Sequence, residues 1–419
     1  MNTFRPRFFK AALILAAVTS LAVLVTSYLS KAPTDYEIEL AKIENDILSI
    51  KASAPSASAE RALTLVYLLY LKATLTGRYD DFNAAETETR NTIRTLGSSD
   101  ELYLVMANLN YTFHRLDETA HDLDRLSSLA ASPRAQVLRT NIDLQQGKYV
   151  DAKRGYESVI QARRTWDNLA RLAYLESKIG DPLAADRLYG EAQDEITAKE
   201  MRSYAWVEVQ RGLLDSRQGR YEEAWAHYRR ADRAYSGYWL IEDHMAELLG
   251  AQRKYGEAIA RYESVVTRAP RPEFQQAIGD LYALMGQPEQ ARPWHDKALA
   301  AYLASARRGE VHYFHHLAWF YADVREDGAE AVKWARRDLD LRRNYATREA
   351  LAWALYRAGR IPESLAEIKR SLSAGVKDAH LFFHAAMIYL AAGRTSEGKQ
   401  FFKRAAAVNP RYEAFHVHR

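Results

Sequence analysis

The feature that most restricts the fold of this chain is a unit that recurs about every 34 residues. In each unit, a small or neutral residue lies within an apolar stretch of helical periodicity. These residues are Ala107, Thr140, Ala173, Gly212, Ala246, Gly279, Ala318, Ala352 and Ala386. A unit this short cannot bury its apolar face alone, so neighbouring units must stack on one another. The 419 residues are therefore expected to form one continuous stack instead of two or three globular domains.

A turn follows most of these small residues after seven positions. It usually contains a glycine, which suits the left-handed backbone at the C-terminus of a helix. The turn glycines are Gly147, Gly180, Gly219, Gly286, Gly359 and Gly393. A second small residue follows the turn and a large one comes four positions later, as in Ala224 and Tyr228. Small residues allow two antiparallel helices to approach closely. Each unit is therefore predicted to be a helical hairpin.

The pattern resembles the tetratricopeptide repeat family in stretches such as AIGDLYALMGQPEQARPWHDKAL, LLDSRQGRYEEAWAHYRRA and LAWALYRAGRIPESLAEI. The resemblance covers about residues 60–410. It implies an all-α fold, a right-handed α-solenoid of about ten helix-hairpin units. It also implies a non-catalytic role in binding other proteins or peptides along the concave groove of the stack.

Some units depart from the pattern. Gly77 begins a turn without the accompanying small residues, and His114 replaces a turn glycine. The register near Arg325 is ambiguous by one residue. Two intervals are 39 residues long, with the additional residues around 196–204 and 299–311. Both stretches favour helix and lack turn signals, so lengthened helices are predicted there.

Residues 11–29 form a 19-residue run without charge, close to the roughly 20 residues that span a hydrocarbon core. The preceding tail, residues 1–10, contains Arg5, Arg7 and Lys10. By the positive-inside rule, residues 11–29 are predicted to be a transmembrane signal-anchor helix with a cytoplasmic basic tail. The rest of the chain is then expected in the periplasm, at the inner membrane of a bacterial cell. Two alternatives are a signal peptide cleaved near Ala32, which would release a secreted or periplasmic protein, and a buried core helix.

Residues 30–59 are predicted to form a juxtamembrane helix and a linker. Tyr36, Leu40, Ile43 and Ile47 repeat with helical spacing. This apolar stripe is expected either to cap the solenoid or to form a dimerising stalk. The linker is the small, polar stretch 52–59. At the other end, residues 411–419 form a tail with His416 and His418.

Several chemistries are excluded or disfavoured by the sequence. The absence of cysteine excludes thiol catalysis, disulfides and cysteine-ligated metals. The 58 basic and 54 acidic residues alternate along the chain, which disfavours nucleic acid as a partner. Residues 393–399 have phosphate-loop spacing, but Gln400 replaces the required Ser or Thr. No nucleophile elbow, metalloprotease helix or dinucleotide fingerprint is found, so neither an enzyme nor a cofactor is predicted.

Histidines are concentrated on the first helix of some units. His312 and His316, and likewise His380 and His384, are four residues apart, which would place each pair on one helix face. His244 occupies an equivalent position. Such pairs can contribute to recognition of a partner, can be polar packing residues, or can ligate a divalent metal, although a tight metal site needs a third ligand.

The same helix phase gives further candidates for a partner-binding groove. The candidates are Tyr174, Trp206, His244, His316, Trp319, Phe320, Trp353, His380, Phe383 and His384. Aromatic residues are enriched where partners bind, although packing between helices is an alternative for each. No basic pattern matches the carboxylate clamp with which some members of the family hold acidic chain ends.

These observations predict a non-catalytic, membrane-anchored scaffold that binds a protein or peptide outside the cytoplasm. One alternative is a metal-handling accessory protein that uses the groove histidines, with weak binding of a divalent metal. The other alternative is a structural subunit of an envelope polysaccharide or secretion assembly.

Overall fold

The computed structural model describes residues 32–52 and 58–415, and every regular element within these ranges is helical. Helix α2 (Asp35–Ala52) precedes ten hairpins. The first helices of the hairpins are α3 (Ala59–Thr76), α5 (Asp100–Thr112), α7 (Pro133–Gln145), α9 (Trp166–Ile179), α11 (Met201–Ser216), α13 (Trp239–Ala251), α15 (Pro272–Leu284), α17 (Phe314–Trp319) with the π-helix η1 (Phe320–Val324), α19 (Tyr345–Arg357) and α21 (Ala379–Ala391). The second helices are α4 (Tyr79–Leu96), α6 (Leu116–Asp124), α8 (Tyr149–Ala162), α10 (Pro182–Asp194), α12 (Tyr221–Ala234), α14 (Tyr255–Arg268), α16 (Pro288–Arg307), α18 (Gly328–Leu341), α20 (Ile361–Leu372) and α22 (Thr395–Val408).

A residue with positive φ lies in the turn of each hairpin. These residues are Gly77, His114, Gly147, Gly180, Gly219, Arg253, Gly286, Glu326, Gly359 and Gly393. Glycine adopts this conformation without steric cost, whereas the three other residues meet a penalty of about 1–2 kcal/mol each. The ten left-handed turns confirm the all-α fold and the predicted number of hairpin units.

Close packing within each hairpin follows the predicted alternation of small and large residues. A Cβ atom added at Gly212 of α11 would lie 2.3 Å from the ring of Tyr228 on α12. One added at Gly279 of α15 would lie 2.3 Å from the ring of His295 on α16. The large residue of the second helix therefore fills the space left by the small residue of its own hairpin.

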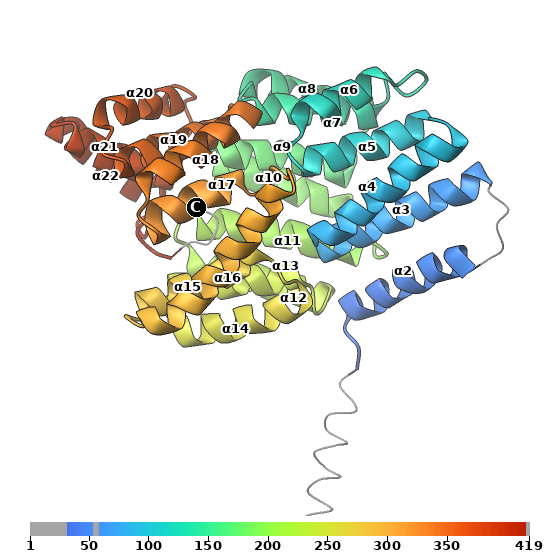
Figure 1. Ribbon diagram of the computed structural model, residues 1–419, viewed down its shortest axis with the longest axis horizontal. Helices are drawn as coiled ribbons and strands as arrows, with labels where there is room; N and C mark the ends of the chain where they lie inside the picture. Colours follow the sequence, from blue (N-terminus) through green and yellow to red (C-terminus); the bar gives the residue numbers. More distant parts are fainter. Residues whose placement is uncertain (1–31, 53–57, 416–419) are drawn as a thin grey trace, which may run out of the picture.

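The hairpins are arranged in a curved stack (Figure 1). The first helices of adjacent units pack on one another, as α9 does with α11 and α19 with α21. The second helices α6, α8, α12, α14 and α20 lie at the periphery of the view. The first helices consequently line the inner, concave side of the stack.

The curvature brings the last three hairpins against the first five. Tyr149 Oη accepts a hydrogen bond of 3.0 Å from the backbone N–H of Tyr345. The backbone N–H of Lys377 donates to the carbonyl of Ile179 over 3.2 Å. Further along, the guanidinium of Arg411 lies 4.6 Å from the centre of the Tyr221 ring. The stack therefore closes on itself over about one turn, and its inner space is enclosed between early and late hairpins.

Helix α2 covers the first hairpin. Its stripe residues Tyr36, Ile43 and Ile47 are buried, and it packs on α3. The Asp35 carboxylate also accepts hydrogen bonds from the backbone and hydroxyl of Ser236, after α12. The apolar stripe of α2 therefore caps the solenoid, which is one of the two roles predicted for it.

The predicted location in the inner membrane is wrong for the part of the chain that can be tested. Within residues 32–52 and 58–415, no helix combines the length and the apolar character needed to cross a membrane. Residues 1–10 and 11–29, on which the prediction rested, lie outside the described residues, as do His416 and His418.

The two long intervals are accommodated differently. Helix α16 has 20 residues, so the helix around 299–311 is lengthened as predicted. Around 196–204, by contrast, α10 ends at Asp194 and α11 begins at Met201, so most of the additional residues form a loop. The Glu200 carboxylate accepts hydrogen bonds from the backbone N–H and the hydroxyl of Thr197. These bonds stabilise the non-helical loop.

Candidate functional site inside the stack

The first helices of the early hairpins enclose a cavity of about 470 Å³ that is rich in aromatic side chains. We call Trp166, Arg171, Tyr174 and Trp206 within it the aromatic pocket. Arg171 and Tyr174 are three residues apart on α9, so they lie on one face of that helix. The indole rings of Trp166 and Trp206 have centroids 6.4 Å apart. Two predicted groove residues, Tyr174 and Trp206, are thus brought together.

The cavity of the aromatic pocket carries an excess of one positive charge, because Arg171, Arg202 and Asp167 line it. Arg171 Nε is buried and has no hydrogen-bond partner among the described residues. The ammonium group of Lys178, one turn beyond Tyr174 on α9, lies 5.2 Å from the centre of the Tyr174 ring. Burial alone would raise the pKa of Tyr174, but the charges of Lys178 and Arg217 outweigh burial and lower it. The surface that α9 and α11 present to the inner space therefore favours an anionic ligand.

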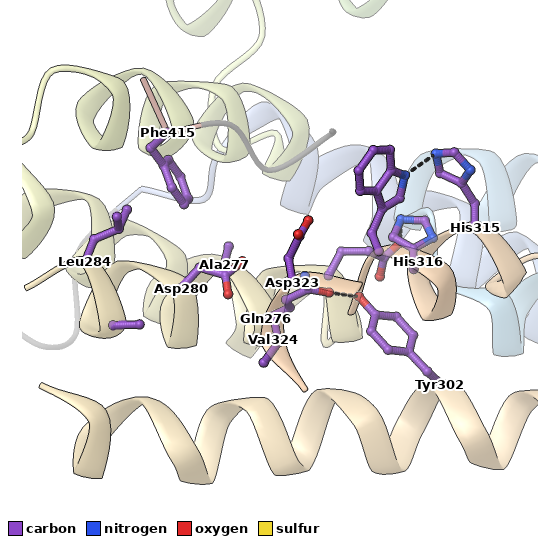
Figure 2. A pocket seen from close by; sticks show the side chains of 13 residues that line it. Gln276, Ala277, Asp280, Leu284, Tyr302, His315, His316, Asp323, Val324 and Phe415 are labelled. Atoms are coloured by element: carbon purple, nitrogen blue, oxygen red, sulfur yellow. Dashed lines mark hydrogen bonds and ion pairs between the residues drawn. The ribbon is translucent and has the colours of Figure 1, made fainter. Parts of the chain in front are cut away.

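A second cavity, of about 500 Å³, lies between α15, α16 and α17 (Figure 2). Tyr302 donates a hydrogen bond of 3.0 Å to Gln276 at its base. On the opposite wall, the indole N–H of Trp319 donates to His315 Nε2 over 3.0 Å. Because Nε2 is the acceptor, the proton of neutral His315 is on Nδ1, which lies 2.9 Å from the Asp338 carboxylate.

Asp338 holds this network in place. It is 1% exposed, and burial would raise the pKa of its carboxyl group. The adjacent Arg342 and the hydrogen bond from His315 outweigh burial and keep the pKa well below its ordinary value. The carboxylate therefore stays ionised and fixes the ring of His315 at the cavity wall.

His315 and Trp319 also line a third cavity, of about 460 Å³, between the early hairpins and α19 and α21. Glu349 and His380 face this cavity. The Glu349 carboxylate is 2.7 Å from Nδ1 of His384 and 3.6 Å from Nδ1 of His380. Burial would raise the pKa of Glu349, but the hydrogen bonds from the two imidazoles outweigh it and lower the pKa to about 2.

The other predicted groove residues are distributed between cavity walls and core. His316 lines the second cavity, with Nε2 4.0 Å from the Glu273 carboxylate. Phe320 is fully buried, and His244 is 5% exposed and stacks on Tyr228. Trp353 is buried and donates a 2.9 Å hydrogen bond to Asp323.

Phe383 packs between two aromatic rings of the last hairpin. Its ring centroid lies 6.1 Å from that of Phe402 and 5.8 Å from that of Tyr412. The ring is therefore part of an aromatic cluster in the last hairpin.

The two predicted histidine pairs differ in structure. His380 and His384 share one face of α21 and converge on Glu349. His312, however, precedes the first residue of α17, and its ring stacks on Tyr79 of the first hairpin with centroids 3.6 Å apart. His312 and His316 therefore do not form a pair on one helix.

Sequence reasoning missed Arg171, Trp166, His315 and Glu349. Arg171 could have been found, because it lies three residues before Tyr174 in the same helix phase. Glu349 could not, because it comes from a different unit than the histidines it contacts. The cations Arg171 and Lys178 lie on α9, and Arg217 directly follows α11, so they do not form a pattern within one repeat unit.

Comparison with known proteins places the last hairpin in a family. Residues 379–412 match the tetratricopeptide repeat. No curated protein matches the sequence. Among solved structures, the Cut9–Hcn1 hetero-tetramer of the APC/C is 12% identical over 89% of this chain and 79% of that chain, with a TM-score of 0.46.

Two further structures are similar in part. A tetratricopeptide repeat protein from Parabacteroides merdae is 20% identical over 58% of this chain and 93% of its own, with a TM-score of 0.34. The human IFIT1 dimer with PPP-AAAA is 15% identical over 88% of this chain and 94% of its own, also with a TM-score of 0.34. The predicted tetratricopeptide repeat is confirmed for the hairpin at residues 379–412, and the described part of the chain is built from stacked helical hairpins of the same kind of architecture.

Proposed function

We propose that this protein is a non-catalytic scaffold that binds an acidic segment of a partner protein in the aromatic pocket. The observation that carries the proposal is Arg171, whose Nε lacks a hydrogen-bond partner among the described residues and which lines one cavity together with Trp166, Tyr174 and Trp206. The Arg171 side chain as a whole is half-buried at the cavity wall, so the exposed part of its guanidinium can form a charge-assisted hydrogen bond with a carboxylate of a bound peptide.

The composition of the pocket supports a binding role. Trp, Tyr and Arg are the side chains that most often dominate the energy of protein interfaces. Here two indoles, a phenol and a guanidinium face one cavity on two adjacent first helices. Because α9 and α11 are held by packing on both sides, little conformational entropy is lost when a peptide binds.

The cations next to the aromatic pocket support an acidic ligand over a basic one, whereas the second cavity is lined by the carboxylates Glu273, Asp280 and Asp323. Lys178 and Arg217 line the third cavity, next to the aromatic pocket, and together lower the pKa of Tyr174. An acidic peptide that extends from the aromatic pocket toward them would be attracted over several residues. The attraction is electrostatic, so binding should weaken as ionic strength rises.

The sequence supports a non-catalytic role, because none of the nucleophile, metalloprotease or dinucleotide motifs sought in it is found. Two carboxylates that contact histidines of the inner cavities, Asp338 and Glu349, are held ionised by their partners, which suits a structural role. A carboxyl group that acts as a general acid would instead need a raised pKa.

The test is selection of peptides from a random displayed library on the full chain, followed by affinity measurement with labelled synthetic peptides. We expect enrichment of sequences rich in Asp and Glu. Trp206→Ala and Arg171→Gln should each weaken their binding at least tenfold, since interface anchors contribute about 2 kcal/mol or more. The matched control is Trp225→Ala, which removes an indole from α12, a second helix.

Enriched peptides without acidic residues would contradict the proposed ligand. Equal losses in the Trp206→Ala and Trp225→Ala variants would contradict the proposed site. Circular dichroism of each variant shows whether the fold is retained, so that loss of binding is not confused with unfolding.

A further inference from the structure

Three potential metal ligands converge where α19 meets α21. Glu349 extends from α19, and His380 and His384 extend from successive turns of α21. The Glu349 oxygen Oε1 is 2.7 Å from Nδ1 of His384 and 3.6 Å from Nδ1 of His380. One potential ligand atom from each side chain lies within 4.8 Å of those of the other two.

These separations fit a single transition-metal ion. Ligand atoms about 2.0–2.2 Å from Zn²⁺ in a tetrahedral site are separated from each other by about 3.3–3.5 Å. The two oxygen–nitrogen distances, 2.7 and 3.6 Å, are on either side of this value. Small rotations of the imidazoles would therefore replace a shared hydrogen bond by coordination, without movement of either helix.

The surrounding side chains hold the donors in position. The His384 ring packs on the indole of Trp353, with centroids 4.2 Å apart, and on that of Trp319 at 5.2 Å. Both His384 and Glu349 are buried, at 2% and 5% exposure. Preorganisation of this kind lowers the cost of assembling a metal site.

The ligands are also reachable from solvent. Glu349 and His380 line the third cavity, so an ion can enter through it and a fourth coordination position would face the same space. Three protein ligands with one open position are typical of zinc sites that exchange a ligand. Two imidazoles and one carboxylate favour Zn²⁺ over Mg²⁺ and Ca²⁺, which bind mainly through oxygen.

We propose that Glu349, His380 and His384 form a binding site for a divalent transition-metal ion, with Zn²⁺ as the ion favoured by the ligand set. The site uses residues that are separate from the aromatic pocket. A test of the metal site is therefore independent of a test of peptide binding.

The experiment is titration of the full chain, purified with a tag that contains no histidine, with Zn²⁺ in a calorimeter. Co²⁺ provides a spectroscopic probe, because its visible absorption reports tetrahedral coordination. One equivalent of Zn²⁺ should bind, and one equivalent of Co²⁺ should give the tetrahedral spectrum. Glu349→Gln should weaken binding at least tenfold, since loss even of an outer partner of a ligand costs about 10- to 100-fold.

Controls separate this site from other histidines. His121→Ala removes an exposed imidazole on α6, and a double His416→Ala, His418→Ala variant removes the histidines of the C-terminal tail. Both should retain the affinity of the parent chain. His380→Ala provides a second test of the site, because His380 is less buried than His384 and its removal leaves a smaller cavity.

The proposal is overturned if the parent chain binds no Zn²⁺ in the calorimeter. It is also overturned if Glu349→Gln and His380→Ala variants that retain the helical circular dichroism bind Zn²⁺ as tightly as the parent. Loss of binding only in the variant lacking His416 and His418 would place the metal in the tail and would equally refute the site.

Discussion

Replacement of Gly180 by alanine tests the contact that closes the stack. Gly180 lies in the turn between α9 and α10 with φ of +86°. A Cβ atom there would lie 2.5 Å from both the Cβ and the carbonyl oxygen of Lys377, which precedes α21. The substitution therefore introduces a clash between hairpins that are distant in sequence.

The expected loss of stability has two contributions. Any residue with a Cβ at this φ pays about 1–2 kcal/mol. Overpacking against a backbone carbonyl adds about 1–3 kcal/mol, because the Lys377 main chain cannot rotate away as a side chain would. The free energy of unfolding of Gly180→Ala should thus fall by about 2–5 kcal/mol.

The matched control is Gly393→Ala. Gly393 occupies the same turn position in the last hairpin with φ of +74°, but a Cβ there meets no atom within 4 Å. It should lose only the conformational contribution, about 1–2 kcal/mol. Urea unfolding followed by both circular dichroism and tryptophan fluorescence gives the two values and shows whether the hairpins unfold together. Equal losses in the two variants would refute the contact between Gly180 and Lys377.

Two further predictions concern other contacts between distant hairpins. Trp239→Phe should lower the free energy of unfolding by about 1–3 kcal/mol in urea titrations, since the indole N–H donates over 3.0 Å to the Leu75 carbonyl, which would then be unsatisfied; an unchanged value would contradict this. Burial lowers the pKa of His312 to about 4, so its contribution to stability is complete above about pH 6.5 and is lost as the pH falls toward 4. The free energy of unfolding should therefore fall by up to about 3 kcal/mol between pH 6.5 and pH 4. A phenylalanine at this position can still stack on Tyr79, so in His312→Phe the free energy of unfolding should depend less on pH over this range. An identical pH dependence in the parent and the variant would exclude this role of His312.

The hairpins could be predicted from the sequence because each depends on local contacts. The positions of Arg253 and His114 follow from the repeat even though neither is glycine, and both have positive φ. The ambiguous register near Arg325 also has a structural cause. The backbone N–H of Arg325 bonds to the carbonyl of Phe320, five residues earlier, so the π-helix η1 absorbs one additional residue and the turn moves to Glu326.

The candidate site could be predicted only in part, because closure of the stack depends on small rotations summed over many units. The repeat indicates that Tyr174 and Trp206 share the inner face. It does not indicate that His312 meets Tyr79 of the first hairpin, or that Trp319 lies over His384 two hairpins later. Such contacts depend on the curvature of the whole stack, which no local pattern encodes.

Crosslinking between two introduced cysteines tests closure of the stack most directly. The chain contains no native cysteine, and the side chains of Gln145 on α7 and Asn344 before α19 meet at 3.3 Å. The double variant Gln145→Cys, Asn344→Cys should therefore react with a short bifunctional maleimide to give one intramolecular product with altered gel mobility. Each single variant should give none, and the double variant should give much less product when it is unfolded in denaturant before the reagent is added. A double variant that crosslinks no more efficiently when folded than when unfolded would contradict closure, and with it the enclosed cavities.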